Sequence, residues 1–214
     1  MSTTMDQQAA RGKKAEQRRA SMHRLMELAR AQFIAQGYDA TTVDQIAAGA
    51  GMSKGAVYFY FKSKANLLSA LLDEAERLTV DPAFGAVEEA RGSARDQLVA
   101  FLHSQSIAGQ EYADRMLLII LMSIELHGRD TPVEDRLASV DDRMKKLLTT
   151  VVSAGKRQGV FTKAVPTKEL VSVILAVNQG CFLQWYRRSD ELNGHELVRA
   201  LRTTILDGVL ERKG

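Results

Sequence analysis

The residues best suited to chemistry lie close together near the start of the chain, between Thr41 and Lys64. Hydroxyls, lysines and a run of aromatic residues surround a glycine-containing turn there, a pattern typical of a short helix placed in the DNA major groove. Hydroxyl and ammonium groups bind phosphates, which positions such a helix on the duplex. The residues that we expect to contact DNA are Thr42, Ser53, Lys54, Gly55, Tyr58, Phe59, Tyr60 and Lys64.

Four members of this set, at the starts of the two short helices, have defined expected roles. Lys54 begins the second short helix, where side chains reach base edges, and lysine can donate to guanine O6 and N7. Gly55 allows the backbone to come close to the groove. Thr42 and Ser53 are helix caps, and a helix N-terminus also favours a phosphate. A cap without any DNA contact is the alternative for both.

Four aromatic residues follow one another from Tyr58 to Phe61. Successive helical positions point in different directions, so the four rings cannot all be buried. We expect Phe61 in the core, Tyr58 and Tyr60 at the DNA surface, and Phe59 against a thymine methyl or a sugar.

The chain is rich in helix-forming residues and has only 3 prolines, so we expect an all-α fold. Apolar spacing, caps and terminal glycines predict about nine helices. They should cover roughly 14–36, 42–49, 54–61, 63–81, 93–108, 111–126, 132–158, 167–188 and 193–210. We expect a flexible basic arm at 1–18, a helix-turn-helix domain at 19–65, and a helical effector-binding and dimerisation domain at 66–214.

Charge divides the chain in the same place. Residues 1–65 hold 10 Lys and Arg against 5 Asp and Glu, a balance of +5, whereas the rest balances at −2. A basic first part suggests a polyanionic partner, although a surface fluctuation would give the same numbers. The overall charge of +3 is too small for a non-specific architectural protein.

Signals for an enzyme, a membrane span or secretion are lacking. The 4 histidines do not pair at metal-ligand spacing, and no catalytic or phosphate-loop motif occurs. Cys181 is the only cysteine, which excludes an internal disulfide and fits a reducing compartment. No apolar run reaches membrane-spanning length, and the first residues do not form a secretory signal. We therefore expect a cytoplasmic protein with no cofactor, no metal and no enzymatic activity.

Residues 20–72 resemble the DNA-binding domain of the TetR family of bacterial transcriptional regulators. The resemblance rests on Ala29, Phe33, Gly37-Tyr38, Thr41-Thr42, Ile46-Ala47, Ala50 to Gly55, Val57 to Phe61, Lys64 and Leu67-Leu68. It implies a homodimer that reads a palindromic operator and pairs through its last two helices. It further implies a repressor in which a small molecule enters the second domain, shifts the fourth helix and separates the two DNA-binding domains. The alternatives left open are an activator and a member without a small effector.

The second domain is also expected to hold an effector cavity. The residues that we expect to line it are Phe101, Met116, Ile120, Met122, Val151, Asn178, Phe182 and Trp185. Asn178 is an amide in an otherwise apolar helix, so it needs a ligand, a water or a partner subunit as its hydrogen-bond partner. His103 and His127 could orient a polar group, although ordinary structural histidines are the alternative. We expect an apolar or aromatic effector.

An apolar stripe on the last two predicted helices is the expected dimer interface. Its members are Leu170, Ile174, Leu201, Ile205 and Val209, with Trp185 as an alternative anchor. The same stripe could equally be intramolecular core, and only the TetR resemblance favours the interface.

Overall fold

The computed structural model describes residues 2–210, with the side chains from residue 12 onward except that of residue 14. Within these residues the regular elements are all α-helices, and an isolated β-bridge pairs Phe161 with Leu210. The predicted all-α fold is therefore confirmed. The helices are α1 (Ser2–Gln36), α2 (Val43–Gly49), α3 (Lys54–Phe61), α4 (Lys64–Thr79), α5 (Asp81–Glu89), α6 (Ala94–Glu111), α7 (Ala113–Glu125), α8 (Pro132–Arg157), α9 (Thr167–Arg187) and α10 (Gly194–Val209).

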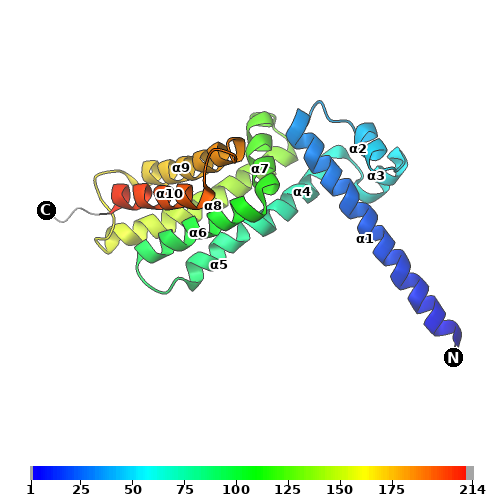
Figure 1. Cartoon of the computed structure of the whole chain (residues 1–214), viewed down its shortest axis with the longest axis horizontal. Helices are drawn as coiled ribbons and strands as arrows, with labels where there is room; N and C mark the ends of the chain where they lie inside the picture. The colour runs from blue at the N-terminus through cyan, green and yellow to red at the C-terminus, as the bar shows by residue number, and fades with distance from the viewer. Residues whose placement is uncertain (1, 211–214) are drawn as a thin grey trace.

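The molecule is elongated, as Figure 1 shows. Helices α1–α3, which we call the head, lie at one end, and helices α5–α10, which we call the body, lie at the other. Helix α4 runs between them and packs against helices of both parts. Helix α4 is therefore the connection between head and body.

Local capping fixes the two short helices of the head. The Thr42 hydroxyl accepts a hydrogen bond from the Gln45 backbone N–H at 3.2 Å, and the Gln45 side chain accepts one from the Thr42 backbone N–H at 2.8 Å. Thr42, predicted as a helix cap, therefore forms a capping box with Gln45. Ser53 caps α3 by accepting from the Ala56 backbone N–H at 3.2 Å. Gly51 lies between the helices with φ +65°, a left-handed conformation that favours glycine.

Helix α1 is longer than predicted. We expected it to begin near residue 14, after a flexible arm, but it begins at Ser2 and extends well away from the head (Figure 1). The added segment has no proline and is rich in Ala, Gln, Lys and Arg, all of which favour a helix. The start of α1 therefore differs from the predicted start near residue 14, and the helix continues through most of the segment predicted as an arm.

Helix α5 is the second difference from the prediction. We expected Asp81-Pro82 to end the helical segment, yet α4 ends at Thr79 and α5 begins at Asp81. A proline in the first turn lacks only an N–H that would have no partner there, and its φ suits a helix. The described chain therefore has ten helices instead of about nine.

The core of the head is shared with the body. Phe33, Ile46 and Phe61 belong to one buried apolar cluster that also contains Leu118 and Met122 of α7. A separate cluster fills the body, with Phe101, Leu148, Val151, Phe161 and Ile174 among its members. Because the head buries part of its apolar surface against α7, a movement of α7 must disturb the head.

No helix among residues 2–210 combines the length and the apolar character needed to cross a membrane. In the same described range, no group of three or more His, Cys, Asp and Glu side chains is arranged to hold a metal ion.

Candidate nucleic-acid interface and internal cavity

The outer face of α3 presents the predicted aromatic side chains to solvent. Tyr58 is 42% exposed and Phe59 is 60% exposed, whereas Val57 and Phe61 on the inner face are buried. The predicted burial of Phe61 is confirmed. Large exposed rings are unusual on a soluble surface and indicate a site of interaction.

Tyr60 differs from the expectation. It is half-buried, and its ring packs against those of Phe59 and Phe61 at centroid distances of 5.4 and 6.4 Å. Two residues along a helix correspond to a rotation of about 200°, so Tyr60 turns away from the direction of Tyr58. The exposed pair on α3 is therefore Tyr58 and Phe59, and not Tyr58 and Tyr60.

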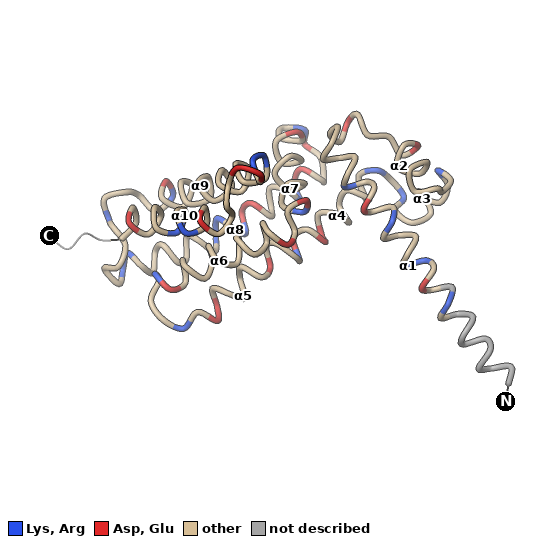
Figure 2. Tube along the Cα trace, viewed as in Figure 1, with Lys and Arg blue, Asp and Glu red and all other residues tan. Residues whose placement is uncertain are grey.

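Arg18 of α1 lies beside this surface, a position that sequence reasoning missed. Its guanidinium carbon is 5.3 Å from the centre of the Phe59 ring and 5.8 Å from that of Tyr60. Lys13, Arg18 and Arg19 are all exposed. Figure 2 shows Lys and Arg positions in blue along the part of α1 that leaves the head. Only the fold shows that this basic segment adjoins α3, because the two are far apart in sequence. The side chains of Arg11 and Lys14 lie outside the described residues.

Lys54 stands at the first position of α3 and is exposed, as expected. Its ammonium donates to the Asp44 carboxylate of α2 at 2.8 Å. This hydrogen bond and the negative charge of Asp44 raise the pKa of Lys54 above 10.5. The side chain is therefore held across the helix-turn-helix, and a base would have to compete with Asp44 for it.

Gly55 follows on α3 and is open to solvent. A Cβ atom there would meet only Ser53 Oγ, at 3.8 Å, which is ordinary van der Waals contact. Nothing inside the protein therefore requires glycine at this position. The expectation that Gly55 lets the protein backbone come close to the DNA groove remains a prediction.

Lys64 is bound within the protein. Its ammonium donates to the backbone carbonyls of Tyr38 and Thr41 at 2.8 and 2.9 Å and lies 4.2 Å from the centre of the Tyr38 ring. Two of its three hydrogens thus fasten the α1–α2 connection to the start of α4. A role in phosphate binding would have to use the remaining hydrogen.

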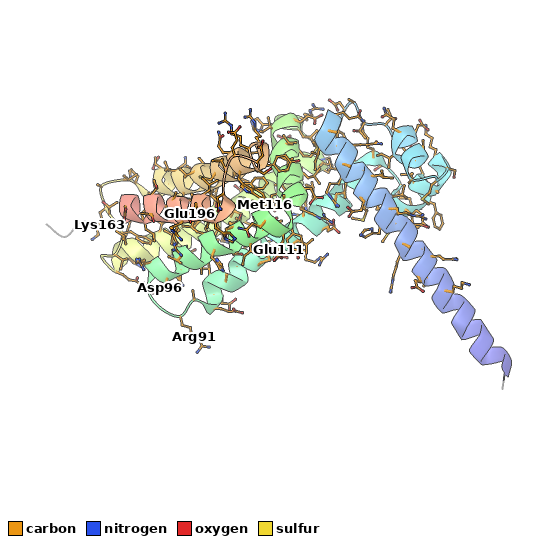
Figure 3. All side chains as sticks on the ribbon, in the orientation of Figure 1. Arg91, Asp96, Glu111, Met116, Lys163 and Glu196 are labelled. Carbon is orange, nitrogen blue, oxygen red and sulfur yellow. The ribbon has the colours of Figure 1, made fainter. Side chains whose placement is uncertain are left out.

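A cavity of about 470 Å³ lies between α4, α7, α8 and α9. Three of the predicted residues line it, namely Met116, Ile120 and Asn178. A smaller cavity of about 50 Å³ lies between α6, α9 and α10, and there Met116 and Asn178 are joined by the predicted Phe182 and Trp185. Figure 3 places Met116 within the helical bundle. The structure therefore gathers five of the eight predicted residues at two neighbouring cavities.

The other three predicted residues line neither of these cavities. Phe101 and Val151 are fully packed in the core of the body, and Met122 is packed in the core shared with the head. Apolar spacing marks a buried face of a helix but does not distinguish close packing from a cavity wall. His103 is exposed and lines neither cavity, whereas His127 lines the larger one near its exposed side.

Sequence reasoning missed Gln105, which lines both cavities. It is 6% exposed, and its Nε2 donates to the Thr79 backbone carbonyl at 2.9 Å. The sequence feature that could have identified Gln105 is a polar residue at an inward position of a helix. The same feature identified Asn178.

The predicted dimer stripe is intramolecular. Leu170, Ile174, Leu201, Ile205 and Val209 are all buried in the core of a single chain. The outward faces of α9 and α10 carry different residues, including Val173, which is 55% exposed. The spacing of these apolar residues thus identified the inner side of the last two helices. This agrees with the alternative stated from the sequence, in which the stripe is intramolecular core.

A buried ionic network joins the head to the body, and the sequence did not predict it. Arg30 of α1 is 2% exposed and donates to Asp114 of α7 at 2.6 Å and to Glu74 of α4 at 2.9 Å. It also contacts Glu27, and Arg115 bonds to Glu27 and Asp114. A buried arginine needs such partners to offset the loss of hydration, so this junction is specific in geometry.

Helix α7 holds the head at its other end as well. The Glu125 carboxylate accepts from the backbone N–H groups of Tyr38 and Asp39 at 2.8 and 3.0 Å. Gly37 adopts φ +86° just beneath it, and a Cβ there would come within 2.9 Å of Glu125 Oε2. Glycine is therefore required at position 37 by its conformation and by this close approach.

Comparisons with known proteins agree with this arrangement. The family model described as bacterial regulatory proteins, tetR family, matches residues 25–71, which span the second half of α1 to the first half of α4. The crystal structure of the MbdR regulator from Azoarcus sp. CIB is 37% identical, covers 89% of this chain and 100% of its own, and gives a TM-score of 0.79.

Two further proteins extend the comparison. The transcriptional repressor KstR2 of Mycobacterium tuberculosis is 26% identical over 194 residues, covering 86% of this chain and 90% of its own. The crystal structure of AibR in complex with isovaleryl coenzyme A and operator DNA has a TM-score of 0.72 at 16% identity, covering 86% of this chain and 97% of its own. MbdR is thus described as a regulator and KstR2 as a transcriptional repressor.

Proposed function

We propose that this chain, which belongs to the TetR family of bacterial regulatory proteins, is a transcriptional repressor that binds a DNA operator through its head and releases it when a small molecule enters its body. In this proposal residues 19–65 bind DNA, and residues 66–214 bind the effector and form the dimer.

The outer face of α3 is the observation that carries the DNA-binding part. Lys54, Tyr58 and Phe59 are exposed together on one short helix, and Arg18 adds positive charge beside it. A short helix that projects from a three-helix unit is the element that enters the major groove. Thr42 and Ser53, at the N-termini of α2 and α3, are placed to bind phosphates.

The larger cavity supports an effector. Its volume of about 470 Å³ falls within the roughly 300–1,000 Å³ of small-molecule sites. Met116, Ile120 and the buried Asn178 give one side of it apolar groups and a hydrogen-bonding amide, whereas Glu134, Asp141, Asp142 and Lys145 of α8 line another side. AibR holds isovaleryl coenzyme A and operator DNA on a similar fold, and a small-molecule response is the property that we propose for this chain.

Helix α7 is the proposed link between cavity and head. Met116 and Ile120 line the cavity, whereas Leu118 and Met122 belong to the core shared with the head. Glu125 at its end holds the α1–α2 connection. A ligand that displaces α7 would therefore move the head directly, in addition to the shift of α4 that the family resemblance implies.

We further propose a homodimer formed by the outward faces of α9 and α10, in place of the buried stripe expected from the sequence. Val173 of α9 is exposed, and Gly180 and Gly208 have no atom within 4 Å of an added Cβ. Small residues on an exposed face leave room for a second copy to pack closely. Two heads related by a two-fold axis would read a palindrome.

The test of this function is a selection of bound sequences from a random duplex library. We expect enrichment of a palindrome, with a dissociation constant at least tenfold below that for random duplex. Tyr58→Ala and Phe59→Ala should each weaken operator binding, whereas Ile107→Ala, which alters an exposed apolar residue of α6, should not. Recovery of no common sequence would contradict the proposal.

A further inference from the structure

Gln105 of α6 stands in the wall that the two cavities of the body share. It is buried, and it lines both the larger cavity and the smaller one. A shared wall does not join the two cavities into one, but a molecule in either of them would lie beside this side chain. Gln105 is therefore placed to respond to the filling of either cavity.

The Gln105 amide also holds the last residue of α4. Its Nε2 donates to the Thr79 backbone carbonyl at 2.9 Å, and Thr79 itself lines the larger cavity. The last carbonyls of a helix have no partner within the helix, so a buried one must find its donor elsewhere. Thr79 is 2% exposed, and its hydroxyl donates to the Ala75 carbonyl of its own helix at 2.7 Å. The bond from Gln105 thus ties the end of α4 to α6.

An alternative donor for the Thr79 carbonyl lies four residues further along the chain. In a continuous α-helix that carbonyl would accept from the Ala83 backbone N–H. The Ala83 N–H instead donates to the Val80 carbonyl at 3.0 Å, where α4 ends and α5 begins. The α4–α5 junction therefore has two hydrogen-bonding arrangements open to it, and the Gln105 amide stabilises the one that is observed.

A different contact holds α4 one turn earlier. The buried Glu76 carboxylate accepts from Arg136 and Arg143 of α8. Among the described residues that line the two cavities, none of these three occurs. A molecule in a cavity therefore meets Gln105 and Thr79, while the ionic contacts of Glu76 lie beyond its reach. Glu76 is thus a fixed point about which the end of α4 can move.

The first half of α4 belongs with the head. Leu67 and Leu71 lie in the apolar cluster that the head shares with α7, and Lys64 donates to two carbonyls of the α1–α2 connection. A shift of α4 at Thr79, about the fixed point at Glu76, therefore reaches the head at the other end of the same helix.

We propose that Gln105 is the positioning residue through which an occupied cavity acts on α4. A molecule that draws this amide toward itself removes Nε2 from the Thr79 carbonyl, which then pairs with the Ala83 N–H, and the end of α4 moves about Glu76. This inference rests on the proposed function and specifies its regulation. The operator is held while the bond between Gln105 and Thr79 is intact, and it is released when that bond breaks.

Hydrogen exchange of the full-length wild type tests this coupling without any substitution. If breaking the bond weakens operator binding, then operator binding must make the bond open less often, because the coupling is reciprocal. Exchange over residues 76–84 should therefore slow by about fivefold when the operator duplex obtained by selection is added. Equal exchange in this segment with and without the operator would overturn the proposal.

Gln105→Met keeps the length of the side chain and removes the amide, so it imitates an occupied cavity. Without any additive it should weaken operator binding by about fivefold to tenfold and speed exchange over residues 76–84. A residue that only stabilised the fold would lower the melting temperature and leave the operator affinity of the folded protein unchanged. Gln110→Met, at an exposed amide of the same helix that lines the smaller cavity, is the matched control and should change neither quantity.

Failure of this inference and failure of the proposed function give different results. A wild type that selects a palindrome, together with a Gln105→Met protein of equal operator affinity, supports the function and contradicts this inference. A wild type that selects no palindrome contradicts the proposed function. In that case faster exchange over residues 76–84 in Gln105→Met still supports the hold of Gln105 on α4, and unchanged exchange contradicts it.

Discussion

Lys54 and Asp44 form an ion pair of 2.8 Å that joins the start of α3 to the first turn of α2. Both side chains are largely exposed, so the pair contributes little to stability. Its importance lies in DNA binding, because Asp44 places a negative charge next to the lysine that is expected to contact a base. In the free protein Lys54 is therefore bound to Asp44, and this ion pair must break before Lys54 can contact a base.

The first prediction concerns this pair. Asp44→Asn should strengthen binding to any duplex by roughly threefold to tenfold, because it removes an anion near the phosphates and frees Lys54. Lys54→Ala should instead relax the preference at one base pair, by about 1–3 kcal/mol. Fluorescence anisotropy with operator and random duplexes measures both effects. Glu88→Gln on α5 is the charge-matched control, and weaker binding by Asp44→Asn would contradict the interpretation.

The second prediction distinguishes two roles for Lys64. Lys64→Met leaves the Tyr38 and Thr41 carbonyls without their donor, so the melting temperature should fall by several degrees. The slope of log affinity against log salt should change by less than the roughly 0.9 expected for one lost phosphate contact. Lys62→Met, at the exposed neighbouring lysine, is the control. A slope change near 0.9 at constant melting temperature would restore the phosphate role.

The third prediction is a pH dependence at the head–body junction. Partial burial alone would raise the pKa of Asp114, but hydrogen bonds from Arg115 and Arg30 and their positive charges hold it below 3.8. A lowered pKa in the folded state stabilises the protein above the unfolded value of 3.8, and this contribution is lost as the pH falls through the lower folded value. Wild type should therefore exceed Asp114→Asn in urea resistance at about pH 7 and about pH 5.

The difference between these two proteins should shrink as the pH falls below 3.8. Asp190→Asn, at an exposed position far from the junction, serves as a comparison. A difference that stays constant down to about pH 2 would exclude the ionic contribution of Asp114.

The fourth prediction concerns communication through α7. Glu125→Gln keeps the size of the side chain but removes the charge that accepts from Tyr38 and Asp39. The ratio of operator dissociation constants with and without effector should fall several-fold, while binding of the effector itself is retained. Glu111→Gln, at the exposed end of α6, is the control. An unchanged ratio would show that α7 does not carry the signal through Glu125.

The fifth prediction concerns the dimer. Val173→Asp places a charge on the outward face of α9, so light scattering should show a shift from dimer to monomer and operator binding should weaken. Ile107→Asp places the same charge at an exposed apolar position of α6 and should leave the dimer intact. A dimeric Val173→Asp protein would place the interface elsewhere.

Local features of the sequence predicted the head well. Thr42 with Gln45, Ser53 and Gly51 act within a few residues of themselves, so their effect can be inferred without knowing the fold. The same reasoning failed at Pro82, because a proline fits the first turn of a new helix as well as it ends an old one. The predicted start of α1 near residue 14 also differs from the structure, because residues 2–13 contain no proline that would end a helix.

Contacts between distant segments were beyond the sequence. Helical spacing showed that Leu170 and Ile174 are buried, but not that α6 and α8 of the same chain bury them. The internal bonds of Lys64 and the position of Arg18 beside α3 likewise depend on how helices meet in space. Asn178 was recognisable because a lone amide in an apolar helix must be explained wherever the helix packs.

The unbroken course of α1 has a mechanical consequence. Ile34, near one end of this helix, packs against the group that includes Met116 and Phe182 beside the smaller cavity, whereas Arg18 lies against α3. A stiff helix of 35 residues at 1.5 Å per residue acts as a lever about 50 Å long. A tilt of about 5° set near Ile34 would swing its far end through roughly 4 Å, comparable to the spacing between neighbouring base pairs.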